Sequence, residues 1–336
     1  MKRLINVNGG GGRNATSDII SGFCILYMIY GHISFMTNLL GNFLLEWPGY
    51  ILFCYMPWFF FKSGMYYKGA VPIQTIRKGV RRLLIPYLVF TLLGCGVIAL
   101  FSLLKGDFNF TIMIKNTILH ILQQESADGN NALWFLMVLF IVNVVLSLSN
   151  ARKINYVIWL SSIVMASLTP LFDCNPWRWM NVLPAMVFVF SGFILNKNHW
   201  MQHRVTFWLA IVCFLIIIIF SPSYVEFYPN VLYRGNYTLW ILSALSMIVI
   251  LYRGVEYFKD SICLKPFAII GRNTMTLYVC HWPLLLVVKM VADTFHLTPI
   301  HTLILMSLTC VVFLPFCQYC IKRFHWEIII GETKNN

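Results

Sequence analysis

The residues that best combine chemistry with spacing lie in one apolar segment, Asp18 to Met36. Asp18 begins this segment and His32 lies near its far end, and ionisable groups inside such segments are costly and usually functional. In a helix, residues three or four apart share a face, so Asp18, Ser21 and His32 follow one stripe. At the helical rise, Asp18 and His32 are about 21 Å apart. We therefore expect them to serve different ends of one site.

His32 has the chemistry of a general base. A positioned neutral imidazole can remove the proton of an alcohol as its oxygen attacks an acyl group. The structural alternative is a histidine that hydrogen-bonds a neighbouring helix, as ionisable groups inside membranes often do.

His281 lies two residues before Pro283. Proline removes a helical hydrogen bond and frees the carbonyl of Val279. His281 can therefore line an opened pocket and donate to an acyl carbonyl, or it can serve as a structural partner of the freed backbone. The sequence leaves both interpretations open.

Four basic residues precede the third apolar segment: Arg77, Lys78, Arg81 and Arg82. Arg binds phosphate through paired charge-assisted hydrogen bonds, and positions 78 and 81 share a face of a helix. We interpret the cluster as a phosphate-binding site. Positive charge at a cytoplasmic helix end is also expected from membrane topology alone, and the two interpretations are compatible.

Lys62 follows the apolar run Trp58–Phe61. It and Ser21 lie a few residues inside the predicted cytoplasmic ends of two antiparallel helices, so their depths differ by about 3 Å. Lys62 can extend to the nearby interface, or it can face Ser21 and pair with Asp18 or with bound phosphates.

Membrane-spanning helices must position these side chains. Apolar residues make up 59% of the chain and charged residues 11%, which excludes a soluble domain with a polar surface. We predict an all-α integral membrane protein with about ten transmembrane helices. The predicted spans are residues 18–36, 50–67, 83–104, 133–149, 154–172, 181–195, 205–221, 238–252, 273–290 and 301–321.

The distribution of Lys and Arg orients these spans. With a cytoplasmic N-terminus, 19 of the 25 basic residues fall on the inner side, five fall on the outer side, and Lys62 lies within a span. This asymmetry predicts that both termini are cytoplasmic. It also explains the net charge of +13 without a nucleic-acid partner. We expect a flexible cytoplasmic arm at 1–17, one transmembrane domain at 18–321 and a cytoplasmic tail at 322–336.

The cysteines do not suggest a disulfide framework or a metal site. Only Cys174 of the ten cysteines falls clearly in a predicted outer loop. Cys317 and Cys320 form an isolated CxxC, which we interpret as packing thiols. We expect no bound metal.

Several strings resemble, in order, the blocks of the membrane-bound acyltransferase-3 family, and most closely its short polysaccharide and fucose O-acetylase members. The resemblance covers most of the chain. The strings are Arg13–Asp18, Tyr30–His32, Tyr55–Gly64, Arg81–Tyr87, Leu133–Leu136 and Gly271–His281.

The resemblance implies a multi-pass enzyme of the bacterial cytoplasmic membrane. Such an enzyme takes an acyl group from cytoplasmic acyl-coenzyme A, here expected to be acetyl-CoA, and places it on a sugar hydroxyl of a cell-surface or lipid-linked glycan. His32 matches the family's first-helix histidine, and Lys78 and Arg81 match its basic residues before the third helix. The expected partners are therefore acyl-CoA, a glycan or lipid-linked sugar, and membrane lipids.

The chain departs from the family pattern at two positions. Ser21 stands where a basic residue is common, eleven residues before the histidine, and Tyr55 stands where a histidine often precedes Met-Pro. Lys62 is our candidate to supply the missing charge from the second helix.

Candidate acceptor-binding residues lie in the longest predicted outer loop and at the start of the span that follows it. Glu125 and Asp128 can accept hydrogen bonds from sugar hydroxyls, and Trp134 can stack on a sugar ring. The alternatives are loop solvation for the acids and a place in the interfacial aromatic belt for the tryptophan.

A transporter or flippase for a lipid-linked sugar is the competing interpretation. Apolar helices with buried ionisable residues and proline breaks suit it equally well. Against it, the sequence shows no paired repeat halves, and its intramembrane polar residues concentrate in the first three spans and the ninth.

Overall fold

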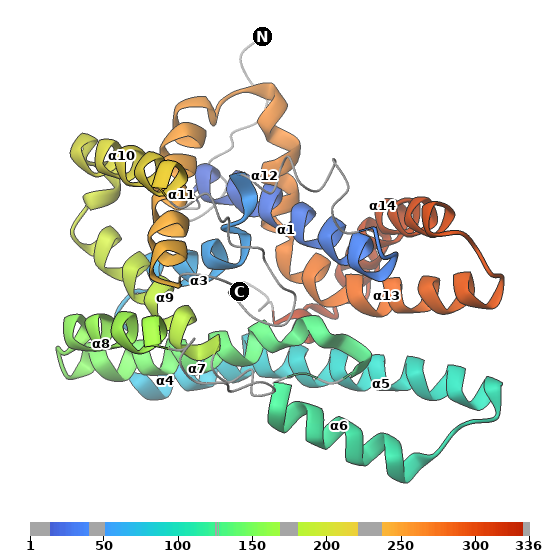
Figure 1. The fold of residues 1–336 in the computed structure, drawn as a ribbon. Coiled ribbons are helices and arrows are strands. Elements are labelled where there is room, and N and C mark those ends of the chain that lie inside the picture. The colour runs from blue at the N-terminus through green and yellow to red at the C-terminus, as the bar shows by residue number, and fades with distance from the viewer. Residues whose placement is uncertain are drawn as a thin grey trace.

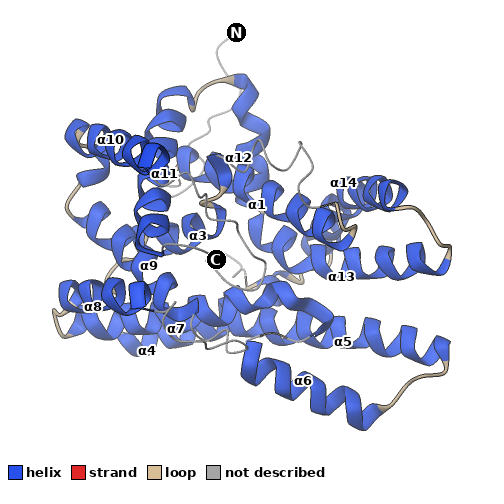
Figure 2. Cartoon of the chain, viewed as in Figure 1, coloured by secondary structure: helices blue, strands red, loops and turns tan. Residues whose placement is uncertain are grey.

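The computed structural model describes residues 14–39, 51–124, 126, 128–168, 181–220 and 237–331. Within these ranges all regular structure is helical, as the all-α prediction requires (Figures 1 and 2). The main helices are α1 (Ala15–Met36), α3 (Tyr55–Met65), α4 (Pro72–Gly79), α5 (Ile85–Lys105), α6 (Phe110–Gln124), α7 (Trp134–Ala151), α8 (Asn155–Leu168), α9 (Val182–Lys197), α10 (Arg204–Phe220), α11 (Tyr237–Phe258), α12 (Lys265–Arg272), α13 (Thr274–Thr294) and α14 (Pro299–Arg323).

Short helical turns connect some of these elements. They are η1 (Val80–Leu84), η2 (Asp128–Leu133), η5 (Trp200–Gln202), η6 (Ile262–Leu264) and η7 (Glu327–Ile330).

Six helical stretches among the described residues are long and apolar enough to cross a membrane. They contain α1, α4 with α5, α7, α11, α13 and α14. Three further apolar helices, α8, α9 and α10, are shorter. With α3 in the second predicted span, each of the ten predicted spans contains a helix, while the count of ten transmembrane helices and the orientation of the termini stay predictions.

The second predicted span differs most from the structure. Residues 50–67 were expected to form one span, but α3 begins at Tyr55, after a turn at Phe53 and Cys54. Pro57 lies in the first turn of α3, where its missing N–H costs no helical hydrogen bond. Proline therefore favours a helix that begins here over one that runs through from residue 50.

Helix α1 begins three residues before its predicted start. Asn14 is the N-cap, and its side-chain oxygen accepts a hydrogen bond from the Ser17 N–H at 3.1 Å. The Asn14 amide also donates to the Tyr252 hydroxyl at 2.8 Å. The same residue therefore starts α1 and ties it to α11.

Helix α12 lies in a region that the sequence interpretation left as an inner loop. It packs closely on the first half of α1, where the rings of Phe23 and Phe267 stack at 4.1 Å. Gly22 faces the backbone of Phe267, and Gly271 faces the backbone of Asp18, so a Cβ at either glycine would collide with main-chain atoms. These close approaches fix α12 against α1.

Helices α4 and α5 form one stretch interrupted by the π-helical turn η1. The Ile85 N–H bonds to the Val80 carbonyl, five residues back. The cause is Pro86, whose ring would clash with the carbonyl of Arg82 in a regular α-helix. Helix α14 is followed by η7, which packs against η1 and α5. The predicted tail therefore starts within α14, and its described part lies against the rest of the protein.

Candidate active site

The structure brings His32 of α1 next to His281 of α13. Their ring centroids are 5.3 Å apart, and the ring planes differ by 25°. Trp282 also contacts His32, edge to face, with centroids 5.0 Å apart. His281 is fully buried and Trp282 is 7% exposed, whereas His32 keeps part of its surface accessible. Of these three side chains, His32 is therefore the one that a substrate can reach.

Local hydrogen bonds fix the tautomer of His281. Its Nδ1 lies 2.6 Å from the Tyr278 carbonyl oxygen and 3.2 Å from that of Leu277. A carbonyl oxygen only accepts, so Nδ1 carries the proton and Nε2 carries a lone pair. Nε2 has no hydrogen-bond partner among the described residues. In the neutral ring the free nitrogen is therefore an acceptor, and the predicted donation from His281 to an acyl carbonyl, which stays a prediction, would require a protonated ring.

The carbonyl that Pro283 frees has a different partner from the one expected. Asn130 of η2 donates its side-chain amide to the Val279 oxygen at 3.3 Å. The Tyr278 hydroxyl donates to the Ala132 carbonyl, which gives η2 a second bond to α13. His281 is therefore not the structural partner of Val279. Asn130 is a site residue that the sequence interpretation missed, and its only signal was its place just before the Leu133–Leu136 string.

Trp282 is the second missed residue. Its indole N–H is buried and lacks a hydrogen-bond partner within the described part of the chain. Buried polar groups in native proteins are normally satisfied, so such a group needs an explanation. Its sequence signal was its position directly after His281.

The structure places Trp134, one of the predicted acceptor-binding residues, against other aromatic rings. Trp134 packs on Phe60 and Phe135, with ring centroids 6.4 and 6.3 Å away, and Phe135 contacts Tyr278 at 5.6 Å. Trp134 thus belongs to an aromatic wall behind His281. Glu125 lies outside the described residues.

A polar cluster surrounds Asp18 near the start of α1. The Lys62 ammonium lies 3.9 Å from the Asp18 carboxylate and donates to the Ser21 hydroxyl at 2.8 Å. Trp58 donates to the same hydroxyl at 3.0 Å. The predicted contact of Lys62 with Ser21 and Asp18 is therefore present, and its role in donor binding stays a prediction.

Arg272 completes this cluster and was missed. Its Nε lies 3.5 Å from the second oxygen of Asp18. The Asp18 side chain is 4% exposed, and that of Arg272 is 40% exposed. A buried carboxylate needs a counter-ion, and Arg272 stands in the same family-like string as His281, which was its sequence signal. Arg272 thus pairs with the buried Asp18 carboxylate through Nε, while part of its side chain stays accessible to solvent.

The four residues of the basic cluster, Arg77, Lys78, Arg81 and Arg82, are all exposed. Lys78 lies near the charges of Arg82 and Lys68. The π turn η1 interrupts the helix after position 79, so the regular spacing assumed for positions 78 and 81 does not hold across it, and their joint binding of phosphate stays a prediction. Three like charges held together favour binding of an anion.

The two ends of the site are joined by the middle of α1. Ile25 and Ile29, on the stripe between Asp18 and His32, are 1% and 5% exposed. The stripe itself is packed, so the predicted channel for a thioester arm must run beside these side chains, and it stays a prediction. Within the described residues, no group of three or more His, Cys, Asp or Glu side chains is placed to hold a metal ion.

Comparison with known proteins identifies the family of the chain. Residues 14–321 match the acyltransferase-3 family model, described as an acyltransferase domain. No curated protein and no solved structure matches the chain. The matched range begins at the N-cap of α1, ends near the end of α14, and includes the histidine pair, the Asp18 cluster and the basic cluster. The chain belongs to the acyltransferase-3 family and is an integral membrane acyltransferase.

Proposed function

We propose that the protein is an O-acetyltransferase of the bacterial cytoplasmic membrane. It moves an acetyl group from cytoplasmic acetyl-CoA to a hydroxyl of a cell-surface or lipid-linked glycan. The observation that carries this proposal is the contact of His32 with His281 and Trp282, since it gathers one accessible imidazole and two buried polar atoms that have no hydrogen-bond partner among the described residues.

His32 acts as the general base. The sugar hydroxyl oxygen attacks the thioester carbonyl carbon while His32 takes the hydroxyl proton. The tetrahedral intermediate then loses the coenzyme A sulfur as the C–S bond breaks, and His32 returns the proton to that sulfur. The products are the sugar ester and free coenzyme A.

The two buried neighbours match the charges that this reaction develops. The Nε2 lone pair of His281 is a hydrogen-bond acceptor beside His32 that is available when His32 gains the proton. The Trp282 N–H is the donor for the carbonyl oxygen, which becomes negative in the tetrahedral intermediate. Both groups would lack a hydrogen-bond partner until substrate binds, as they do in the structure.

The basic cluster binds the donor. Lys78 and Arg82 contact the phosphates of coenzyme A, and Arg77 and Arg81 add to the positive field at this surface. Asp18 keeps Lys62 and Arg272 in place near the start of α1, where Lys62 supplies the charge that the family usually carries at the position of Ser21.

Thioester cleavage tests the proposal directly. Purified protein in nanodiscs is incubated with acetyl-CoA and a glycan pool, and free thiol and glycan-bound acetyl are both measured. His32→Gln keeps the size of the side chain and should lower transfer by about 10²–10⁴-fold, the usual contribution of a general base, while the melting temperature stays unchanged.

Near-normal turnover by folded His32→Gln protein would refute the base assignment. Sugar translocation by the wild-type protein without thioester cleavage would refute the enzyme and favour the transporter.

A further inference from the structure

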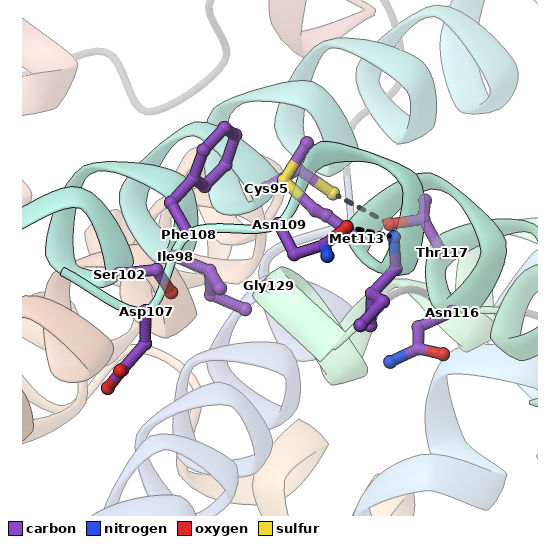
Figure 3. A pocket seen from close by; sticks show the side chains of 11 residues that line it. Cys95, Ile98, Ser102, Asp107, Phe108, Asn109, Met113, Asn116, Thr117 and Gly129 are labelled. Carbon is purple, nitrogen blue, oxygen red and sulfur yellow. Dashed lines mark hydrogen bonds between the residues drawn. The ribbon is translucent and has the colours of Figure 1, made fainter.

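A cavity lies between α5 and α6, away from the histidine pair and the basic cluster. It has a volume of about 220 Å³, and η2 reaches it through Gly129 (Figure 3). Helix α6 occupies a region that the sequence interpretation treated as an outer loop. The Cys95 thiol of α5 and the Thr117 hydroxyl of α6 lie 3.6 Å apart across it.

The chemistry of the walls identifies the class of ligand. Hydrogen-bonding side chains come from Ser102, Asp107, Asn109, Asn116 and Thr117, and the wall contains one carboxylate and no basic residue. The carboxylate of Asp107 in this wall disfavours phosphates and other anions. Carboxylate, amide and hydroxyl oxygens accept hydrogen bonds from sugar hydroxyls.

The apolar part of the wall suits a sugar ring as well. Phe108 and Met113 line the cavity beside the polar side chains and can pack on the C–H face of a ring. The volume lies below the range of roughly 300–1,000 Å³ that is typical of pockets for drug-sized ligands. One monosaccharide unit therefore matches the cavity better than a nucleotide does.

Two of the amides are ready to bind. The Asn109 side-chain oxygen accepts the N–H of Ile112 at 3.0 Å, which fixes the amide and leaves its NH₂ group to donate. Asn116 shows no hydrogen bond to any described residue and is exposed.

The short helix η2 connects the cavity to the histidine pair. Gly129 lines the cavity and packs on the backbone of Gly94 in α5. The next residue, Asn130, holds the Val279 carbonyl two residues before His281. Helix η2 thus contacts both the cavity and α13. In the predicted topology, the cavity also lies toward the outer end of α5, where an extracytoplasmic acceptor would enter.

We infer that this cavity binds one neutral sugar unit of the acceptor glycan. The inference rests on the proposed O-acyltransferase function. It assigns acceptor binding to α5, α6 and η2, in place of the predicted site at Glu125 and Trp134.

Protection of Cys95 tests binding without requiring catalysis. The wild-type protein in nanodiscs is alkylated with iodoacetamide, and modification of Cys95 is followed by peptide mass spectrometry. Methyl α-glucoside or methyl α-fucoside should slow alkylation of Cys95, whereas glucose 1-phosphate should not, because Asp107 repels it. Protection by glucose 1-phosphate, or the absence of protection by either glycoside, would overturn the inference.

Matched variants on α6 connect binding to turnover. Thr117→Val removes a hydroxyl from the cavity and should raise the acceptor KM by about 3- to 10-fold, the effect of one hydrogen bond, without changing the KM for acetyl-CoA. Thr111→Val makes the same change at an exposed position outside the cavity and should leave both values unchanged. Equal effects of the two variants would overturn the inference. Failure of wild-type thioester cleavage refutes the proposed function, whereas the Cys95 experiment judges the cavity separately.

Discussion

The hydrogen bond from Asn130 to Val279 can be tested by a double-mutant cycle with Pro283. Pro283 is the reason that the Val279 carbonyl lacks a helical partner, and Asn130 supplies the substitute donor at 3.3 Å. Asn130→Ala removes this donor. Pro283→Ala provides a backbone N–H at position 283 that can bond to the same carbonyl. The cost of Asn130→Ala should therefore depend on which residue occupies position 283.

The structure sets the size of this effect. Leaving a buried carbonyl without a donor costs about 1–3 kcal/mol. Asn130→Ala also removes the buried Asn130 Oδ1, which has no partner among the described residues, so the net loss should lie near the lower limit, about 1 kcal/mol. With Pro283→Ala in place, the carbonyl is satisfied by the helix and the loss should fall by about 1 kcal/mol, to near zero.

Unfolding by sodium dodecyl sulfate in mixed micelles, followed by circular dichroism, measures the free energy for all four proteins. Asn143→Ala serves as a matched control, because Asn143 accepts a hydrogen bond from Ser63 at 2.9 Å and touches neither position. Its cost should be the same in both backgrounds. Additivity of Asn130→Ala and Pro283→Ala within about 0.3 kcal/mol would refute the account of Val279. Acetyl transfer should decline with Asn130→Ala, since Val279 lies two residues before His281.

Three further substitutions address the two ends of the site. Trp282→Phe removes the indole N–H and should lower kcat by about 10²–10³-fold with little change in either KM, since the donor acts on the developing oxyanion; an unchanged kcat would argue against that role. Lys62→Met should impair transfer, and Ser21→Lys should partly restore it; full activity of Lys62→Met, measured by thioester cleavage, would exclude the charge-replacement hypothesis. Lys78→Gln and Arg82→Gln should each weaken acetyl-CoA binding, most clearly at low salt, as measured by isothermal titration calorimetry. Unchanged affinity would mean that the basic cluster reflects membrane topology and does not bind the donor.

A control separates the catalytic role of Trp282 from the general cost of losing an indole N–H. Trp159 donates its N–H to the Ser191 hydroxyl at 2.9 Å, away from the histidine pair. Trp159→Phe should lower the melting temperature but leave kcat unchanged.

Long apolar helices and the residues at their ends could be predicted from sequence. The polar face of α1 could be predicted because the helical period and the ionisable residues both lie within one segment. The contact of Lys62 with Ser21 could be predicted because the helical rise places both residues at similar depths in their helices. The amphipathic helix α12 and the 15-residue α6 were missed, because short helices that lie against other elements lack the hydropathy of a span.

Contacts between distant segments could not be predicted in the same way. The approach of His32 to His281 and of Asp18 to Arg272 depends on how α12 and α13 pack on α1, which is set by backbone contacts at Gly22 and Gly271. A single sequence shows such glycines but not what they touch. The π turn is similar: Pro86 was visible, but its effect on the register of the basic cluster required the structure.

The continuity of α1 has a consequence for the choice of acyl donor. A single uninterrupted helix carries Asp18 and His32, so the separation of the Asp18 cluster from the base is constant at about 21 Å. Under the hypothesis that Lys62, held beside Asp18, also contacts the donor's phosphates, the donor must hold its thioester at about this distance from those phosphates. A short thioester that lacks the nucleotide can still diffuse to His32. It lacks the phosphate contacts that would hold its carbonyl carbon beside the base. It should lose turnover as well as affinity.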